Sequence, residues 1–125
     1  MNKPSILVVD DELLIRDLLY DFFSGQGWDI AVAENGEKAL DVLRARKVDL
    51  LLTDIKMPEM DGLTLTSRVK DSHPDLPVIL MTGYPSVETA VTALRAKAQD
   101  YVIKPFNLNQ LFKLVEAALG KEKEQ

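Results

Sequence analysis

Short apolar runs alternate with longer amphipathic stretches along the chain. Three runs, at residues 6–9, 50–52 and 78–81, contain apolar residues only. Such runs are typical of strands that are covered on both faces, as in a parallel sheet. Two weaker runs, at residues 29–33 and 101–103, favour strands at the edges of that sheet.

The intervals between these runs show helical periodicity. Apolar residues recur every three or four positions, which is typical of amphipathic helices whose apolar stripe faces a core. Shorter patterns lie around residues 39–43 and 65–69. Glycine and proline separate the elements, so the chain is predicted to form an α/β layer fold of five successive βα units with right-handed crossovers. The clearest stripes are Leu14, Leu18 and Phe22, with Ile15 and Leu19 beside them; Val87, Val91 and Leu94; and Leu108, Leu111, Phe112, Val115 and Leu119.

The length of 125 residues fits a single domain, residues 1–125, without room for a second catalytic or DNA-binding module. The polar end of the chain, residues 120–125, is interpreted as a frayed helix end or the beginning of a linker. The N-terminal segment has neither a signal-peptide pattern nor a span of about 20 apolar residues. We therefore expect a cytoplasmic protein.

The charge and cysteine content exclude several functions. Twenty acidic residues against 15 basic ones give a formal net charge of −5, which argues against a protein that coats nucleic acid. The absence of cysteine excludes disulfides and thiolate metal sites and is compatible with a reducing cytosol. His73, the only histidine, is interpreted as a solvated loop residue.

Polar side chains follow four of the predicted strands directly. Asp10 and Asp11 follow the first strand, Asp54 ends the third, Thr82 ends the fourth, and Lys104 follows the fifth. In an open parallel sheet, ligands bind beyond the carboxyl ends of the strands. We therefore expect these side chains to meet at one edge of the sheet.

Each of these residues also has a simple structural interpretation. The acids after the first strand could cap a helix, Asp54 and Thr82 could stabilise turns, and Lys104 could be a solvated loop residue. Together, however, three carboxylates at one edge repel one another unless a cation is present. Oxygen-only donors suit Mg²⁺, and a lysine and a hydroxyl beside them suit a phosphoryl group. The combination predicts a phosphoryl-transfer site in which an aspartate can be the nucleophile.

The chain resembles the receiver domain of two-component response regulators, a family that includes the chemotaxis regulators. The resemblance covers essentially the whole chain and is carried by four segments. The segments are VVDDE at 8–12, LTDIKMPEMDG at 52–62, MTGY at 81–84 and DYVIKPF at 100–106. The resemblance implies a doubly wound, flavodoxin-like three-layer sandwich with a five-stranded parallel sheet in the order 2-1-3-4-5.

The resemblance also implies an aspartyl-phosphate site that depends on Mg²⁺ or Mn²⁺. Asp54 is the implied phospho-acceptor. Asp11 and Asp54 would bind the metal directly and Asp10 through water. Lys56 would contribute its backbone carbonyl, with its side chain toward solvent.

Further residues of the four segments receive roles from the same resemblance. Lys104 would pair with Asp54 and then contact the phosphoryl oxygens. Pro105 would follow a cis peptide bond that aims Lys104 inward. Thr82 and Tyr101 would form a switch pair. Other implied roles are rate tuning by Lys56 and Tyr84 and structural roles for Pro58 and Gly62.

The implied function is to take a phosphoryl group from a sensor histidine kinase and not to turn over a substrate as an enzyme. Phosphorylation would change the surface of the fourth helix, fifth strand and fifth helix and so control an output domain, a downstream protein or a homodimer. No direct contact of the domain with nucleic acid or membrane is expected. One position departs from the family: Lys97 stands where glycine is usual, and a left-handed conformation there would cost about 1–2 kcal/mol.

Three alternatives fit less well. A haloacid-dehalogenase-like phosphatase needs an Asp-x-Asp motif after the first strand, whereas Asp10 and Asp11 are adjacent. A flavodoxin-like cofactor binder needs a phosphate loop where these two acids would repel phosphate. A degenerate receiver that acts only as a binding module would lack some of the acids, the threonine or the lysine, and none is missing.

Overall fold

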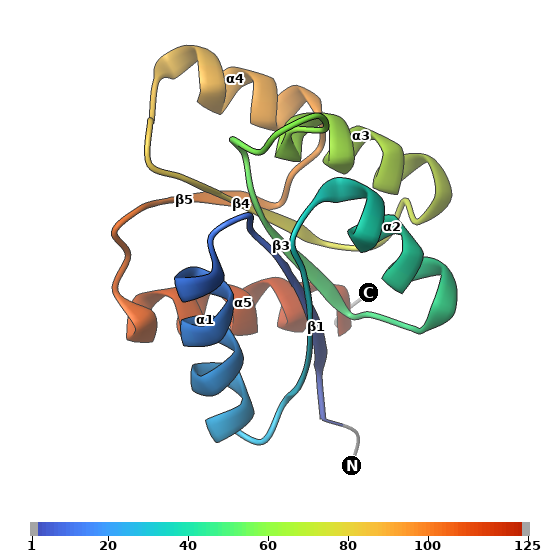
Figure 1. Ribbon diagram of the computed structural model, residues 1–125, viewed down its shortest axis with the longest axis vertical. Helices are drawn as coiled ribbons and strands as arrows, with labels where there is room; N and C mark the ends of the chain where they lie inside the picture. The colour runs from blue at the N-terminus through green and yellow to red at the C-terminus, as the bar shows by residue number, and fades with distance from the viewer. Residues whose placement is uncertain (1–2, 124–125) are drawn as a thin grey trace.

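Five strands and five helices alternate along residues 3–123, the part of the chain that the computed structural model describes; side chains are described for residues 3–120 (Figure 1). The elements are β1 (Ser5–Val9), α1 (Leu13–Gly25), β2 (Asp29–Ala33), α2 (Gly36–Ala45), β3 (Leu50–Asp54), α3 (Gly62–Ser72), β4 (Val78–Thr82), α4 (Val87–Arg95), β5 (Asp100–Ile103) and α5 (Leu108–Lys123).

The strands form one parallel sheet in the order β2-β1-β3-β4-β5, which confirms the predicted topology. The two weaker apolar runs are the edge strands β2 and β5, as predicted. Helices α1 and α5 cover one face of the sheet, and α2, α3 and α4 cover the other (Figure 1).

The central strands are buried on both faces, which explains their uninterrupted apolar sequence. In β3, Leu51 belongs to the core beneath α2, α3 and α4, while Leu50 and Leu52 belong to the core beneath α1 and α5. All three side chains are fully buried. Since each such leucine contributes roughly 1.5–3 kcal/mol when buried, the two cores hold the sheet rigidly and so fix the ends of its strands.

Side-chain caps define where four helices begin, and at α5 the cap is Asn107, which accepts from the N–H of Gln110 at 3.1 Å. Asn35, Asp61 and Ser86 each accept a hydrogen bond from the backbone N–H three residues later, at the starts of α2, α3 and α4. Such caps stabilise a helix by about 1 kcal/mol. The N-terminus of α1 differs, because its N-cap residue Glu12 makes no side-chain cap.

The predicted stripe of α4 faces solvent, and that of α1 does so only in part, because Ile15, Leu19 and Phe22 pack in the core beneath α1 and α5. In α1, Leu14 is 81% exposed, whereas Leu19 and Phe23 are fully buried. In α4, Val87 is 82% exposed, and the buried residue is Ala93. Apolar residues on neighbouring faces of a helix recur at the same interval of three or four positions. Periodicity alone therefore did not identify which of these residues pack on the sheet.

The third stripe packs as expected. Leu111, Val115 and Leu119 of α5 are buried against the sheet. Helix α5 continues to Lys123, so residues 120–123 of the predicted tail are helical, while residues 124 and 125 lie outside the described part. Among the described helices, none is both long and apolar enough to span a membrane.

Candidate functional site

The carboxyl ends of the strands bring three of the predicted residues together, with Glu12 beside them. Lys104, which follows β5, places its Nζ atom 2.8 Å from Asp10 Oδ2 and 3.5 Å from Asp54 Oδ1. The same atom lies 3.4 Å from Oε1 of Glu12. A single cation from the fifth strand therefore contacts carboxylates that follow or end the first and third strands.

Both aspartates at the centre of this cluster are buried. Asp10 is fully buried and Asp54 is 5% exposed. One oxygen of Asp10, Oδ1, accepts a hydrogen bond of 2.9 Å from the N–H of Glu12. The two carboxyl groups are thus removed from water while they share one lysine.

Burial and repulsion shift the protonation of these groups. Burial, together with the nearby charge of Asp10, raises the pKa of Asp54 to about 6, and Lys104 only partly opposes this shift. Burial also raises the pKa of Asp10. Burial lowers the pKa of Lys104, but the hydrogen bond and charge of Asp10 outweigh it, so the net shift is upward. The cluster therefore has an excess of negative charge that one lysine does not neutralise.

Carboxylate oxygens of Asp10, Glu12 and Asp54 lie within 4.8 Å of one another, close enough to hold one metal ion. These hard oxygen donors suit Mg²⁺ or Mn²⁺. Asp11 is exposed and borders the same pocket without joining this group of three. Its predicted role as a direct ligand, and that of the Lys56 carbonyl, stay predictions.

A pocket of about 400 Å³ gives access to Asp54 from solvent. Its rim includes Lys56 and Tyr84, whose side chains touch: Lys56 Nζ lies 4.7 Å from the centre of the Tyr84 ring. Both side chains are exposed, which agrees with the expected outward direction of Lys56. The pocket is lined by Asp11, Glu12, Asp54, Lys56, Gly83, Tyr84 and Lys104.

Thr82 and Tyr101 lie on the neighbouring strands β4 and β5. Thr82 is buried, and its hydroxyl accepts a hydrogen bond of 3.0 Å from the N–H of Tyr84. Tyr101 is half-buried against the core beneath α2, α3 and α4. Their role as a switch pair stays a prediction.

The segment after Asp54 returns to this residue and packs against its backbone. A Cβ atom at Gly62 would lie 2.1 Å from the backbone oxygen of Asp54, so only glycine fits there. The Gly62 N–H donates to the oxygen of Ile55, and Pro58 accepts a bond from the N–H of Met60. The Lys104–Pro105 peptide bond is cis, as the resemblance implied.

Sequence reasoning missed the part that Glu12 takes in the group of carboxylates, and it missed a backbone contact made by Arg16. Arg16, on the first turn of α1, donates a hydrogen bond of 2.8 Å from Nη1 to the backbone oxygen of Asp10. For Arg16, the only available signal was an arginine at the start of a helix, where acidic residues are favoured.

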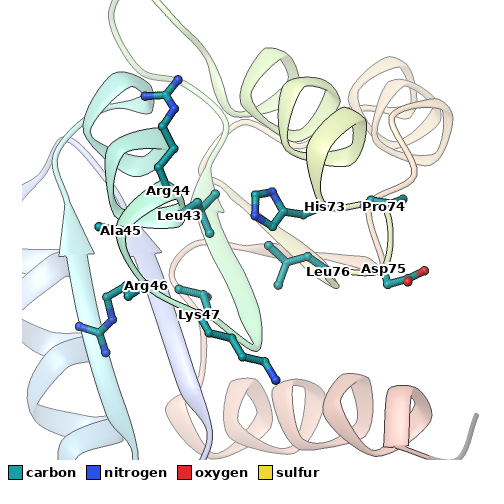
Figure 2. A pocket seen from close by; sticks show the side chains of 10 residues that line it. Leu43, Arg44, Ala45, Arg46, Lys47, His73, Pro74, Asp75 and Leu76 are labelled. Atoms are coloured by element: carbon teal, nitrogen blue, oxygen red, sulfur yellow. The ribbon is translucent and has the colours of Figure 1, made fainter.

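A larger pocket of about 540 Å³ lies at the opposite edge of the sheet, between residues 43–48 and 73–76 (Figure 2). His73 and Leu76 point toward Leu43 across it, whereas Arg44 and Arg46 extend away. The two arginines pair with Asp41 at 2.9 Å and with Asp29 at 2.5 Å.

The geometry of the carboxyl edge agrees with the comparisons with known proteins. The profile of the response regulator receiver domain matches residues 6–116. The chain belongs to this family.

Curated relatives of this receiver domain include the transcriptional regulatory protein ZraR of Escherichia coli O157:H7. ZraR is 44% identical over 95% of this chain, which corresponds to 27% of ZraR. The receiver domain thus spans about a quarter of the length of such relatives.

Solved structures show the same fold. A CheY-like receiver domain from Methanospirillum hungatei superposes with a TM-score of 0.95 at 29% identity, covering 98% of both chains. The response regulator TrrA from Thermotoga maritima, solved in complex with Mg²⁺ and BeF, gives a TM-score of 0.84 at 36% identity, covering 92% of this chain and 98% of TrrA.

Proposed function

We propose that this receiver domain accepts a phosphoryl group on Asp54 from the phosphohistidine of a sensor histidine kinase, with Mg²⁺ or Mn²⁺ bound beside it. The main support is the position of Asp54, which is buried at the end of β3 between Asp10 and Lys104 and borders an open pocket. A protein of this kind is a phospho-acceptor that promotes its own phosphorylation, and not a turnover enzyme.

The transfer is an in-line displacement. An oxygen of ionised Asp54 forms a bond to phosphorus as the phosphorus–nitrogen bond to the kinase imidazole breaks, and the electron pair of that bond stays on the imidazole nitrogen. Lys104 neutralises charge on the phosphoryl oxygens, since its amine already lies 3.5 Å from Asp54. With a pKa of about 6, Asp54 is mostly ionised at neutral pH.

The donor set fits a hard divalent cation. Asp10, Asp54 and Glu12 or Asp11, with the Lys56 carbonyl, would hold it, and it would supply charge neutralisation for the phosphoryl oxygens. The related protein TrrA was solved with Mg²⁺ and BeF, which supports this assignment.

Phosphorylation would act as a switch because it adds about two negative charges at Asp54. These charges attract the Thr82 hydroxyl and the Lys104 amine. Movement of the loop at residues 82–84 then lets the Tyr101 ring turn inward, which shifts the population of states of the α4–β5–α5 surface. The exposed Val87 and Leu94 of α4 give this surface an apolar patch for an output domain, a downstream protein or a second copy.

Hydrolysis of the aspartyl phosphate would end the signal. Lys56 and Tyr84 border the pocket and would tune the access of water to Asp54. We place this exchange with the kinase in the cytoplasm, without contact of the domain with nucleic acid or membrane.

The test is labelling of the purified chain with acetyl phosphate and Mg²⁺, followed by intact-mass spectrometry. Wild-type protein is expected to gain one phosphoryl group, and Asp54→Asn to gain none. Asp75→Asn, which removes an acid at the other pocket, is the matched control and should label like wild type. Full labelling of Asp54→Asn would refute the assignment, and steady release of phosphate from a small ester would indicate an enzyme.

A further inference from the structure

Arg16 occupies an unusual position for an arginine. It is the fourth residue of α1, which begins at Leu13, and the first turn of α1 contains no acidic residue. The N-terminus of a helix carries partial positive charge and favours acidic side chains, so a cation here is unfavourable for the helix itself. A compensating interaction is therefore expected elsewhere.

That interaction is with the backbone of Asp10. Strand β1 ends at Val9, so its ladder does not fix the Asp10 carbonyl, and Arg16 Nη1 binds this oxygen at 2.8 Å. The N–H of Asp10 donates to Ala33 at 3.2 Å, and its Oδ1 accepts from Glu12 at 2.9 Å. Arg16 thus supplies a charged contact to the backbone of Asp10, while Lys104 makes the ion pair with its side chain.

The charge of Arg16 also acts weakly on the loop between β2 and α2. Glu34, between β2 and α2, has its pKa lowered mainly by Lys38, and the charge of Arg16 adds to this effect. Arg16 is half-buried, so its orientation is restricted.

We propose that Arg16 is a positioning residue for the metal site: its guanidinium fixes the β1–α1 loop so that the carboxylates of Asp10 and Glu12 face Asp54. This inference rests on the proposed function, because the group positioned is the metal-binding cluster. Arg16 binds the backbone oxygen of Asp10 and not its carboxylate.

The test compares Arg16→Gln with Arg44→Gln. Both variants remove one positive charge from a helix, but Arg44 pairs with Asp41 at the opposite edge of the sheet. The Mg²⁺ dissociation constant is measured by isothermal titration calorimetry. We expect Arg16→Gln to weaken binding about tenfold, which is within the range for residues that orient metal ligands. Arg44→Gln should stay within about twofold of wild type, because long-range charge effects are screened.

A readout without metal separates positioning from an effect of charge. The N–H of Glu12 is protected by its bond to Asp10, so its hydrogen exchange by NMR reports the order of the loop. Arg16→Gln should lower this protection and Arg44→Gln should not. Arg16→Lys keeps the charge but lacks the planar fork, and is expected to recover part of both effects.

The outcomes are distinguishable from failure of the proposed function. If wild type binds no Mg²⁺ or accepts no phosphoryl group, the proposed function is wrong. If wild type does both and Arg16→Gln matches Arg44→Gln in Mg²⁺ affinity and Glu12 protection, only the role of Arg16 is refuted. Should Arg16→Gln not fold, Arg16→Lys against Arg44→Lys gives the same test: lower Glu12 protection supports positioning, and unchanged protection refutes it.

Discussion

The pockets at the two edges of the sheet differ in how their charges are compensated. At the amino ends of the strands (the amino edge), which hold the larger pocket, Arg44 and Arg46 are exposed, and each pairs with its own acid. Arg44 lies in the last turn of α2 and Arg46 directly follows the helix, so both cations offset the negative end of the helix dipole. At the carboxyl edge, Asp10 and Asp54 are buried and share Lys104.

This difference explains why the smaller pocket is the candidate site. The pocket at the amino edge is larger, about 540 against 400 Å³, but its two arginines are already compensated by the end of α2 and by neighbouring acids. The carboxyl edge retains buried charge that a cation or a phosphoryl group can compensate. Uncompensated buried charge is therefore a better indicator of function in this fold than pocket volume.

Removing the shared lysine should have the largest effect on stability. Lys104→Met leaves two buried carboxyl groups without their cation, and we expect a loss of about 3 kcal/mol in the free energy of unfolding at pH 8. The loss should shrink toward pH 5, because the carboxyl groups can then bind protons instead. Urea denaturation at both pH values measures it.

The control at the amino edge is Lys47→Met, which removes a lysine bordering the larger pocket. This variant should change the free energy of unfolding by less than about 0.5 kcal/mol. Equal losses in the two variants would show that the edges do not differ as described.

Removing the carboxylate of Asp54 should stabilise the metal-free protein at high pH. The pKa of Asp54 is raised by burial to about 6 in the folded state, so the folded state binds more protons than the unfolded state between about pH 4 and pH 6. Ionisation of Asp54 therefore lowers the free energy of unfolding as pH rises from about 4 to about 6, and the full loss is reached above about pH 6. Asp54→Asn should be more stable than wild type by about 2 kcal/mol at pH 8 and nearly equal to it near pH 4.

The matched control is Asp75→Asn at the amino edge, whose difference from wild type should stay small at both pH values. Thermal unfolding of the variants in chelator-treated buffer at both pH values measures these differences. A destabilised Asp54→Asn at pH 8 would contradict the view that charge at this edge is uncompensated.

Bound metal should supply that compensation. At a Mg²⁺ concentration ten times the dissociation constant, we expect the free energy of unfolding to rise by about 1.4 kcal/mol. Removal of Mg²⁺ by a chelator should reverse the rise. Asp54→Asn should show a much smaller rise, and Arg44→Gln a rise equal to that of wild type. Equal responses in all three proteins would place any bound ion elsewhere.

The order of elements and the edge that carries the site could be predicted from the sequence, because uninterrupted apolar runs mark buried parallel strands and polar residues follow them. The exposed residues of α1 and α4 could not, since the exposed Leu14 and the buried Leu19 belong to the same apolar pattern. Nor could the role of Arg16, which depends on how α1 approaches the end of β1. Contacts between elements depend on packing, which a linear pattern does not contain.

The smallest expected effect concerns Lys97, which lies away from both pockets. Its φ of 68° places it in the left-handed region after α4, as anticipated from the usual glycine there. Two hydrogen bonds close the helix around it, from the N–H of Lys97 to Leu94 and from the N–H of Ala98 to Ala93. This is the pattern of a Schellman motif, which normally has glycine at this position.

Lys97→Gly should therefore stabilise the protein by about 0.5–1 kcal/mol, because relief of the left-handed conformation exceeds the added entropy of glycine in the unfolded chain. Lys97→Ala is the matched control: it removes the same charge but keeps the strained conformation, so its free energy of unfolding should stay close to that of wild type. If the glycine and alanine variants were equally stable in urea denaturation, the gain would come from the lost charge and not from the backbone. Neither variant should change Mg²⁺ affinity, since Lys97 borders neither the metal-binding carboxylates nor the pocket that leads to Asp54.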